Sequence, residues 1–113
     1  MRSHMSVKGR PYTWFKAALE RGDLAAIRAE AAELPSVRLD DALRICLVMR
    51  DQSEDATYER AVVRWIGRFA LEVRTAGLED LREAAGAFED LRVRPDTAME
   101  RLASLCSRHR LVP

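Results

Sequence analysis

The segment YERAVVRWIGRFALEVR, residues 58–74, decides the fold because its apolar residues recur at the spacing of a helix. At about 100° per residue they fall within an arc of about 100°, the width expected for a stripe that faces a core. The residues of this stripe are Tyr58, Val62, Trp65, Ile66, Phe69 and Val73. We therefore predict a long amphipathic helix whose aromatic rings lie on the buried side.

Three arginines lie on the other side of this predicted helix, four residues apart, at Arg60, Arg64 and Arg68. Gly67 and Leu71 share that side. Such a row fits a solvated face paired with carboxylates, a protein-binding face, or a nucleic-acid face that follows phosphates. Because the aromatic rings project toward the core, the row has no platform on which bases could stack. The first two alternatives are favoured.

The rest of the chain carries dense helix punctuation and almost no strand pattern. Gly, Pro and capping residues divide it at regular intervals. The predicted helices run from a Thr13 cap to Gly22, from an Asp23 cap to Pro35, from Asp40 and Asp41 to Met49, from a Ser53 or Asp55 cap to Gly77, from Leu78 to Leu91, and from Pro95 and Asp96 through Met99, Leu102, Leu105 and Cys106. The sequence thus predicts an all-α fold of about six helices.

An internal repeat is one form that this fold could take. A shift of about 54 positions places the segment from Leu24 to Arg38 over the segment from Leu78 to Arg92, with apolar and arginine positions matching. With two more residues of shift, Asp40 meets Asp96. Two three-helix repeats would form a short helical-repeat stack, whereas an unrepeated chain would form a compact six-helix bundle. Both alternatives stay open.

Size and charge limit the domain organisation and the partners. The 113 residues suffice for one core, and the opening MRSHM, residues 1–5, resembles a vector-derived tag, so we predict a single helical domain over residues 6–113. Nineteen Lys and Arg against eighteen Asp and Glu give a net charge of +1. No field of the whole molecule therefore attracts nucleic acid or an anionic membrane, and any basic site must be local.

Location and cysteine chemistry follow from simple patterns. No secretory segment follows the N-terminus, and no apolar run approaches the roughly 18 to 20 residues of a membrane span. We predict a cytoplasmic protein with no membrane partner. Cys46 and Cys106 lie among apolar residues of predicted helices, where a thiol behaves as a small buried hydrophobe. We expect neither a disulfide nor a reactive thiol.

Catalytic and metal-binding signals are weak. His109 is the one histidine outside the predicted tag, so no second histidine can complete a metal pair. The sequence has no His-Glu-x-x-His, no Cys-x-x-Cys and no glycine-rich phosphate loop. Pairs of adjacent acidic residues stand mostly near helix starts, where capping and the helix dipole account for them. We predict no enzyme activity, no cofactor and no metal.

Two resemblances bear on these helices. ALERGDLAAIRAEAAEL, residues 18–34, resembles the helix–turn–helix of ankyrin-type repeats, although the Thr-Pro-Leu-His opening and the β-hairpin of those repeats are missing. AAELPSVRLDDALRI, residues 31–45, together with residues 58–72, is similar to a set of small uncharacterised bacterial helical proteins with Leu-x-Asp-Ala-Leu and Tyr-Glu-Arg-Ala-x-Val-Arg-Trp segments. This resemblance implies helices and carries no activity.

Protein binding is the function that remains. Short helical stacks leave end faces and grooves, and a further copy or a partner often covers their apolar surface. The sequence therefore predicts a helical binding module that contacts a protein partner or forms a homo-oligomer. The candidate contact residues are Arg60, Arg64, Arg68 and Leu71. The alternative is a nucleic-acid-binding domain that uses the three arginines.

Overall fold

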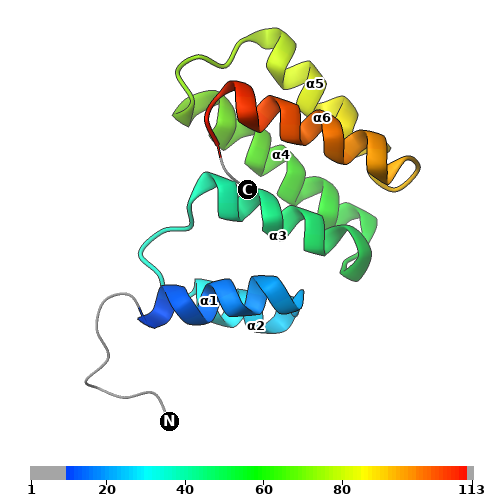
Figure 1. The fold of residues 1–113 in the computed structure, drawn as a ribbon. Helices are drawn as coiled ribbons and strands as arrows, with labels where there is room; N and C mark the ends of the chain where they lie inside the picture. The colour runs from blue at the N-terminus through cyan, green and yellow to red at the C-terminus, as the bar shows by residue number, and fades with distance from the viewer. Residues whose placement is uncertain (1–9, 112–113) are drawn as a thin grey trace. The chain divides into compact units, whose positions relative to one another are not determined.

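The computed structural model describes residues 10–111 and shows six α-helices and no strand in that part of the chain. The all-α prediction and the number of helices are confirmed. The chain divides into two compact units, residues 1–38 and 39–113, and the helices of both are drawn in Figure 1. The predicted tag at residues 1–5 lies outside the described residues, and a single domain over 6–113 stays a prediction.

The first unit is a pair of packed helices, α1 (Arg10–Arg21) and α2 (Leu24–Ala31). The connection between them is two residues long because Gly22 adopts a left-handed conformation, with φ at 67°, that side chains disfavour. Asp23 then caps α2, its carboxylate accepting a hydrogen bond of 3.1 Å from an amide in the first turn. Both predicted roles are confirmed.

The second unit contains four helices, and each packs against the next in chain order. Consequently α4 lies between α3 and α5, as the green and yellow helices of Figure 1 show. The connections between them are short, so successive helices run antiparallel. The helices are α3 (Leu39–Gln52), α4 (Asp55–Glu72), α5 (Leu78–Asp90) and α6 (Pro95–Arg108).

The core of the second unit is built around Trp65. Its ring stacks on Phe69 of the same helix, with ring centres 5.3 Å apart, and meets the edge of Phe88 from α5 at 5.7 Å. The indole N–H donates a hydrogen bond of 2.9 Å to the Leu39 carbonyl at the start of α3. One side chain thus joins three helices, and the burial of large aromatic rings is a main source of folding energy.

Several predicted helix boundaries are wrong in informative ways. Thr13 is not a cap, because α1 already includes Arg10. Ser53 does not cap α4; its hydroxyl instead donates a 2.7 Å hydrogen bond to the Met49 carbonyl and so closes α3. Asp55 lies inside the first turn of α4, where its charge still suits the helix dipole.

One further predicted boundary, at the end of α4, is wrong, and the predicted start of α6 is confirmed. Gly77 does not close α4, which ends at Glu72; it precedes α5, and its amide donates a 2.8 Å hydrogen bond to Asp80. Pro95 opens α6 as predicted. On α6, Met99 is 40% exposed although it was predicted to face the core with its buried neighbours. Those neighbours are Leu102, Leu105 and Cys106.

The predicted repeat finds partial support in the helix starts and in one pair of helix lengths. Leu24 and Leu78, which begin α2 and α5, are 54 positions apart, and α3 and α6 begin 56 apart. The helix lengths correspond in one pair of the three: α3 and α6 each have 14 residues, whereas α2 has 8 and α5 has 13, and α1 has 12 and α4 has 18. The repeat therefore stays a prediction. No helix in residues 10–111 is long and apolar enough to cross a membrane.

Candidate functional site

The rings of α4 face the core, as its apolar spacing predicts. Trp65 is 2% exposed and Phe69 is fully buried, with Tyr58 and Val62 also buried on the same side. The residues between them in sequence point elsewhere because successive helical positions are about 100° apart. Trp65 and Phe69 therefore do not alternate in space with the arginines, and no ring of α4 offers a stacking platform.

The three candidate arginines of α4 differ in their surroundings. Arg60 and Arg64 are exposed, and within residues 10–111 neither makes an ion pair or a side-chain hydrogen bond. Arg68 is half-buried and donates to both carboxylate oxygens of Glu72, at 2.7 and 3.2 Å. This hydrogen bond lowers the pKa of Glu72 below its usual value. Within residues 10–111, two of the three arginines are therefore unpaired and the third is paired with Glu72.

Apolar side chains stand beside these arginines. Leu71 is 87% exposed, and Val63, two turns earlier on the helix, is 63% exposed. Gly67 lies between them, and a Cβ atom added there would meet nothing within 4 Å. We call this surface the outer face of α4; it consists of Arg60, Val63, Arg64, Gly67 and Leu71. Sequence reasoning found all of them except Val63, which the same 100° spacing would have placed there.

A groove of about 420 Å³ runs between α4 and α5 and borders the outer face at Val63. Its floor is apolar and comes from both helices. Charged residues stand at its sides and at one end. The residues that line it are Asp55, Tyr58, Glu59, Val62, Val63, Ile66, Ala85, Phe88, Glu89 and Arg92. We call it the α4/α5 groove. The sequence did not predict it, because a groove depends on which residues of two helices stand opposite each other.

Three contacts fix how α4 and α5 stand opposite each other. The buried Tyr58 hydroxyl donates a 3.1 Å hydrogen bond to the Phe88 carbonyl, and burial raises the pKa of that hydroxyl to about 12. One turn away, Arg92 forms an ion pair with Asp55 and lies over the Tyr58 ring at 5.2 Å. These contacts hold the floor in place and close one end of the groove.

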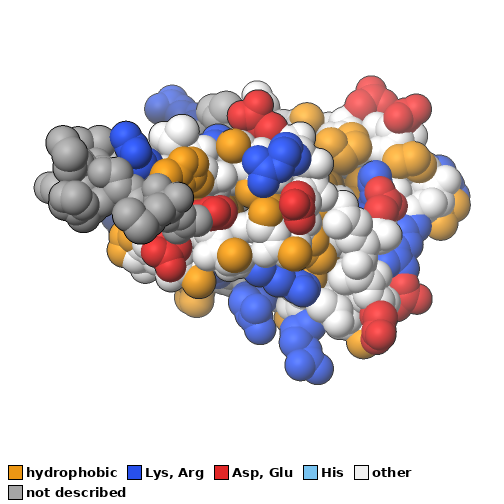
Figure 2. Space-filling view, turned by 90° about the horizontal axis from the view of Figure 1, so that it is seen from below, with side chains coloured by type: hydrophobic (Ala, Val, Ile, Leu, Met, Phe, Trp, Pro, Cys, Tyr) orange, Lys and Arg blue, Asp and Glu red, His pale blue; other side chains and the backbone are white. Residues whose placement is uncertain are grey.

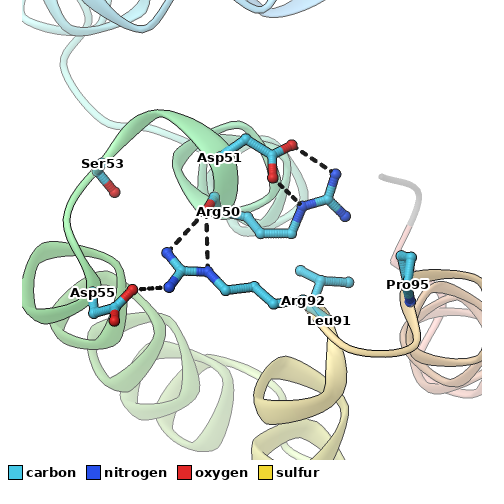
Figure 3. Close-up of a pocket in the computed structure, with 7 residues that line it drawn as sticks. All are labelled: Arg50, Asp51, Ser53, Asp55, Leu91, Arg92 and Pro95. Carbon is cyan, nitrogen blue, oxygen red and sulfur yellow. Dashed lines mark hydrogen bonds and ion pairs between the residues drawn. The ribbon is translucent and has the colours of Figure 1, made fainter.

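A second hollow, of about 470 Å³, lies between the end of α3 and the start of α6. Its two arginines point at partners that they already hold (Figure 3). Arg50 donates to both oxygens of Asp51, at 3.1 and 2.9 Å, which lowers the pKa of Asp51. Arg92 donates to the Arg50 carbonyl at 3.2 and 2.9 Å and pairs with Asp55. An anion would have to displace these contacts, so this hollow is a weak candidate.

A threonine, a histidine and an aspartate meet where α6 ends, which the sequence did not reveal. Thr75 and His109 are 34 positions apart, yet the hydroxyl and Nδ1 are hydrogen-bonded at 2.7 Å. His109 Nε2 lies 3.3 Å from Asp80 Oδ2 without forming a hydrogen bond. The imidazole is 7% exposed and meets the edge of Phe69 at 5.4 Å. We assign this cluster to packing, because it ties the α4–α5 connection, α5 and α6 together.

The cysteines are buried free thiols, as predicted. Burial raises the pKa of Cys46 to about 12 and that of Cys106 to about 11. Because only thiolates act as nucleophiles or metal ligands, these raised pKa values disfavour reaction of either thiol near neutral pH. In residues 10–111, no group of three or more His, Cys, Asp or Glu side chains is placed to hold a metal ion.

Charges of both signs are nearly balanced in the chain, with a net charge of +1. The face drawn in Figure 2 carries basic, acidic and apolar side chains. Comparison with known protein families, curated proteins and solved structures gives no match. The similarity to small bacterial helical proteins therefore stays a prediction.

Proposed function

We propose that this chain is a non-catalytic helical binding module that acts through protein–protein contacts, with the outer face of α4 as its contact surface. One observation carries the proposal. Leu71 is 87% exposed on a helix whose opposite side already supplies the core, and Val63 adds a second exposed apolar side chain. Exposed apolar surface with a polar border is typical of protein interaction sites.

The neighbouring arginines support the same reading. Arginine is enriched at protein interfaces because its planar group makes several hydrogen bonds and packs on apolar surface. Arg60 and Arg64 are exposed and unpaired within residues 10–111, so a partner would not have to break existing ion pairs. A nucleic-acid site would have to rely on these two cations, because Arg68 is held by Glu72. Two phosphate contacts give weak binding that salt abolishes.

Sedimentation velocity over a wide range of protein concentration first tests whether the chain associates with a second copy of itself. Three proteins are compared: the wild type, Leu71→Glu, and the matched control Leu78→Glu. Leu78 is also an exposed leucine, 64% exposed, at the start of α5. We expect the wild type and the control to associate as concentration rises, and Leu71→Glu to stay monomeric.

If the wild type is monomeric throughout, the same three proteins are used to select binders from a library of displayed helical peptides. Binders that require Leu71 but tolerate Leu78→Glu support contact with another protein. The proposal is overturned if no binder shows this dependence, or if association of the wild type is equally sensitive to both substitutions. Circular dichroism on each variant shows that the helices are intact.

A further inference from the structure

The lining of the α4/α5 groove carries more negative than positive charge, because it includes three carboxylates and one arginine. Asp55 and Arg92 form an ion pair at one end, and Tyr58 meets Phe88 one turn further along. Glu59 follows Tyr58 on α4, and Glu89 follows Phe88 on α5, and the two glutamates line the groove from its two helices. Both are exposed, and within residues 10–111 neither makes an ion pair.

Two carboxylates across an apolar floor favour a ligand that combines a cation with an apolar group. Arg92 could form an ion pair with these two carboxylates only by giving up its contacts with Asp55 and the Arg50 carbonyl. Beyond the carboxylates the groove continues along Val63, Ile66 and Ala85, which are apolar and at most partly covered. A groove between two helices also has the shape into which a third helix fits.

The outer face of α4 has the matching chemistry. It offers the exposed Leu71, two exposed cations at Arg60 and Arg64, and the open surface over Gly67. Leucine and arginine seven residues apart, as at Arg64 and Leu71, lie on one side of a helix. Opposite charges at the edge of a contact guide docking and fix its register.

From this complementarity we infer that the α4/α5 groove of one copy of the chain binds the outer face of α4 of a second copy. Leu71 of the incoming helix packs against Val63 and Ile66, while its arginines face Glu59 and Glu89. The inference rests on the proposed function. It adds that the partner is a second copy of the chain and that the outer face of α4 binds to the α4/α5 groove of that copy. Each copy carries both halves of the contact, and the two halves meet at Val63.

Charge reversal on each half, followed by mixing, tests the inference by sedimentation velocity at low ionic strength. The groove variant carries Glu59→Arg and Glu89→Arg, and the outer-face variant carries Arg60→Glu and Arg64→Glu. In each variant alone the two halves carry like charges, and we expect association to weaken at least about tenfold. In the mixture each half meets an opposite charge, so association should return to the wild-type level or beyond it.

Glu100→Arg provides the matched control, because Glu100 is an exposed glutamate on α6 that lines no part of the groove. It should associate as the wild type does. The inference is overturned if the wild type is monomeric, if either reversed variant associates normally, or if the mixture does not recover. The proposed function fails on a different result, namely the absence of any contact, with a second copy or with a displayed peptide, that depends on Leu71 and not on Leu78.

Discussion

The two sides of α4 differ in what they touch more than in how apolar they are. The inner side carries Trp65 and Phe69, which are at most 2% exposed, whereas the outer face carries Val63 and Leu71, which are 63% and 87% exposed. Both sides hold large apolar side chains. The inner ones are covered by α3, α5 and their own neighbours, whereas the outer ones are mostly exposed within residues 39–111. The difference separates residues that stabilise the fold from residues that are available to a partner.

The largest effect is expected on the inner side. Trp65→Ala removes the ring that joins three helices together with its hydrogen bond to the Leu39 carbonyl. We expect the free energy of unfolding to fall by about 3–5 kcal/mol, the usual cost of removing a large buried aromatic side chain. Urea denaturation followed by circular dichroism measures it. Val63→Ala is the control and should change stability by less than about 0.5 kcal/mol. Equal losses of stability in Trp65→Ala and Val63→Ala would contradict the distinction between the inner side and the outer face.

The next effect concerns thiol reactivity. Because burial raises the pKa of Cys46 to about 12 and that of Cys106 to about 11, almost no thiolate forms at pH 8. We expect alkylation of the folded protein to be slower than that of an exposed cysteine by at least about a hundredfold. In denaturant both thiols should react at the ordinary rate. Rapid labelling of either thiol in the folded protein would show that the core of the second unit opens readily.

A smaller loss of stability is expected at the floor of the α4/α5 groove. Tyr58→Phe keeps the ring and removes the hydroxyl that donates to the Phe88 carbonyl at 3.1 Å. A buried hydrogen bond of this kind contributes about 1 kcal/mol to the free energy of unfolding. Thermal denaturation of the variant and the wild type compares them. If Tyr58→Phe is as stable as the wild type, the hydrogen bond does not hold α4 and α5 in register.

The smallest effect is expected for the paired arginine. Arg68→Ala should cost about 0.3 kcal/mol at neutral pH and low salt, because an ion pair four residues apart on a helix surface is worth little. The pKa of Glu72 is lower in the folded state, so this contribution is present above the unfolded pKa of a glutamate, about 4.3, and is lost as pH falls through the folded pKa. The two proteins should therefore converge at acid pH. A difference that grew on acidification would contradict the pairing.

Local patterns predicted the inner side of α4 well. The spacing of Trp65 and Phe69 gave the buried stripe, and Asp23 and Pro95 marked helix starts correctly. These signals depend on residues that are close in the sequence. Helix geometry fixes the direction in which the side chains of such residues point. The errors at Ser53 and Gly77 also lie within a few residues, since each residue serves the neighbouring helix instead.

The groove and the histidine cluster were beyond sequence reasoning for a different reason. Tyr58 and Phe88 are 30 positions apart, and Thr75 and His109 are 34 apart. Nothing in the spacing of either helix says which residue of α5 stands opposite Tyr58, because that register depends on packing across the unit. The outer face could be predicted from the residue spacing of α4 alone, whereas the groove proposed to bind it is formed by both α4 and α5.

Fluorescence of Trp65 tests the separation of the two sides most directly. Trp14→Phe leaves Trp65 as the one tryptophan in the chain. Its emission should lie at short wavelength and resist quenching by acrylamide until the protein is unfolded, because the ring is 2% exposed. Emission at the wavelength of free indole, with quenching as strong in the folded protein as in denaturant, would place the rings of α4 on the surface beside the arginines and contradict the account.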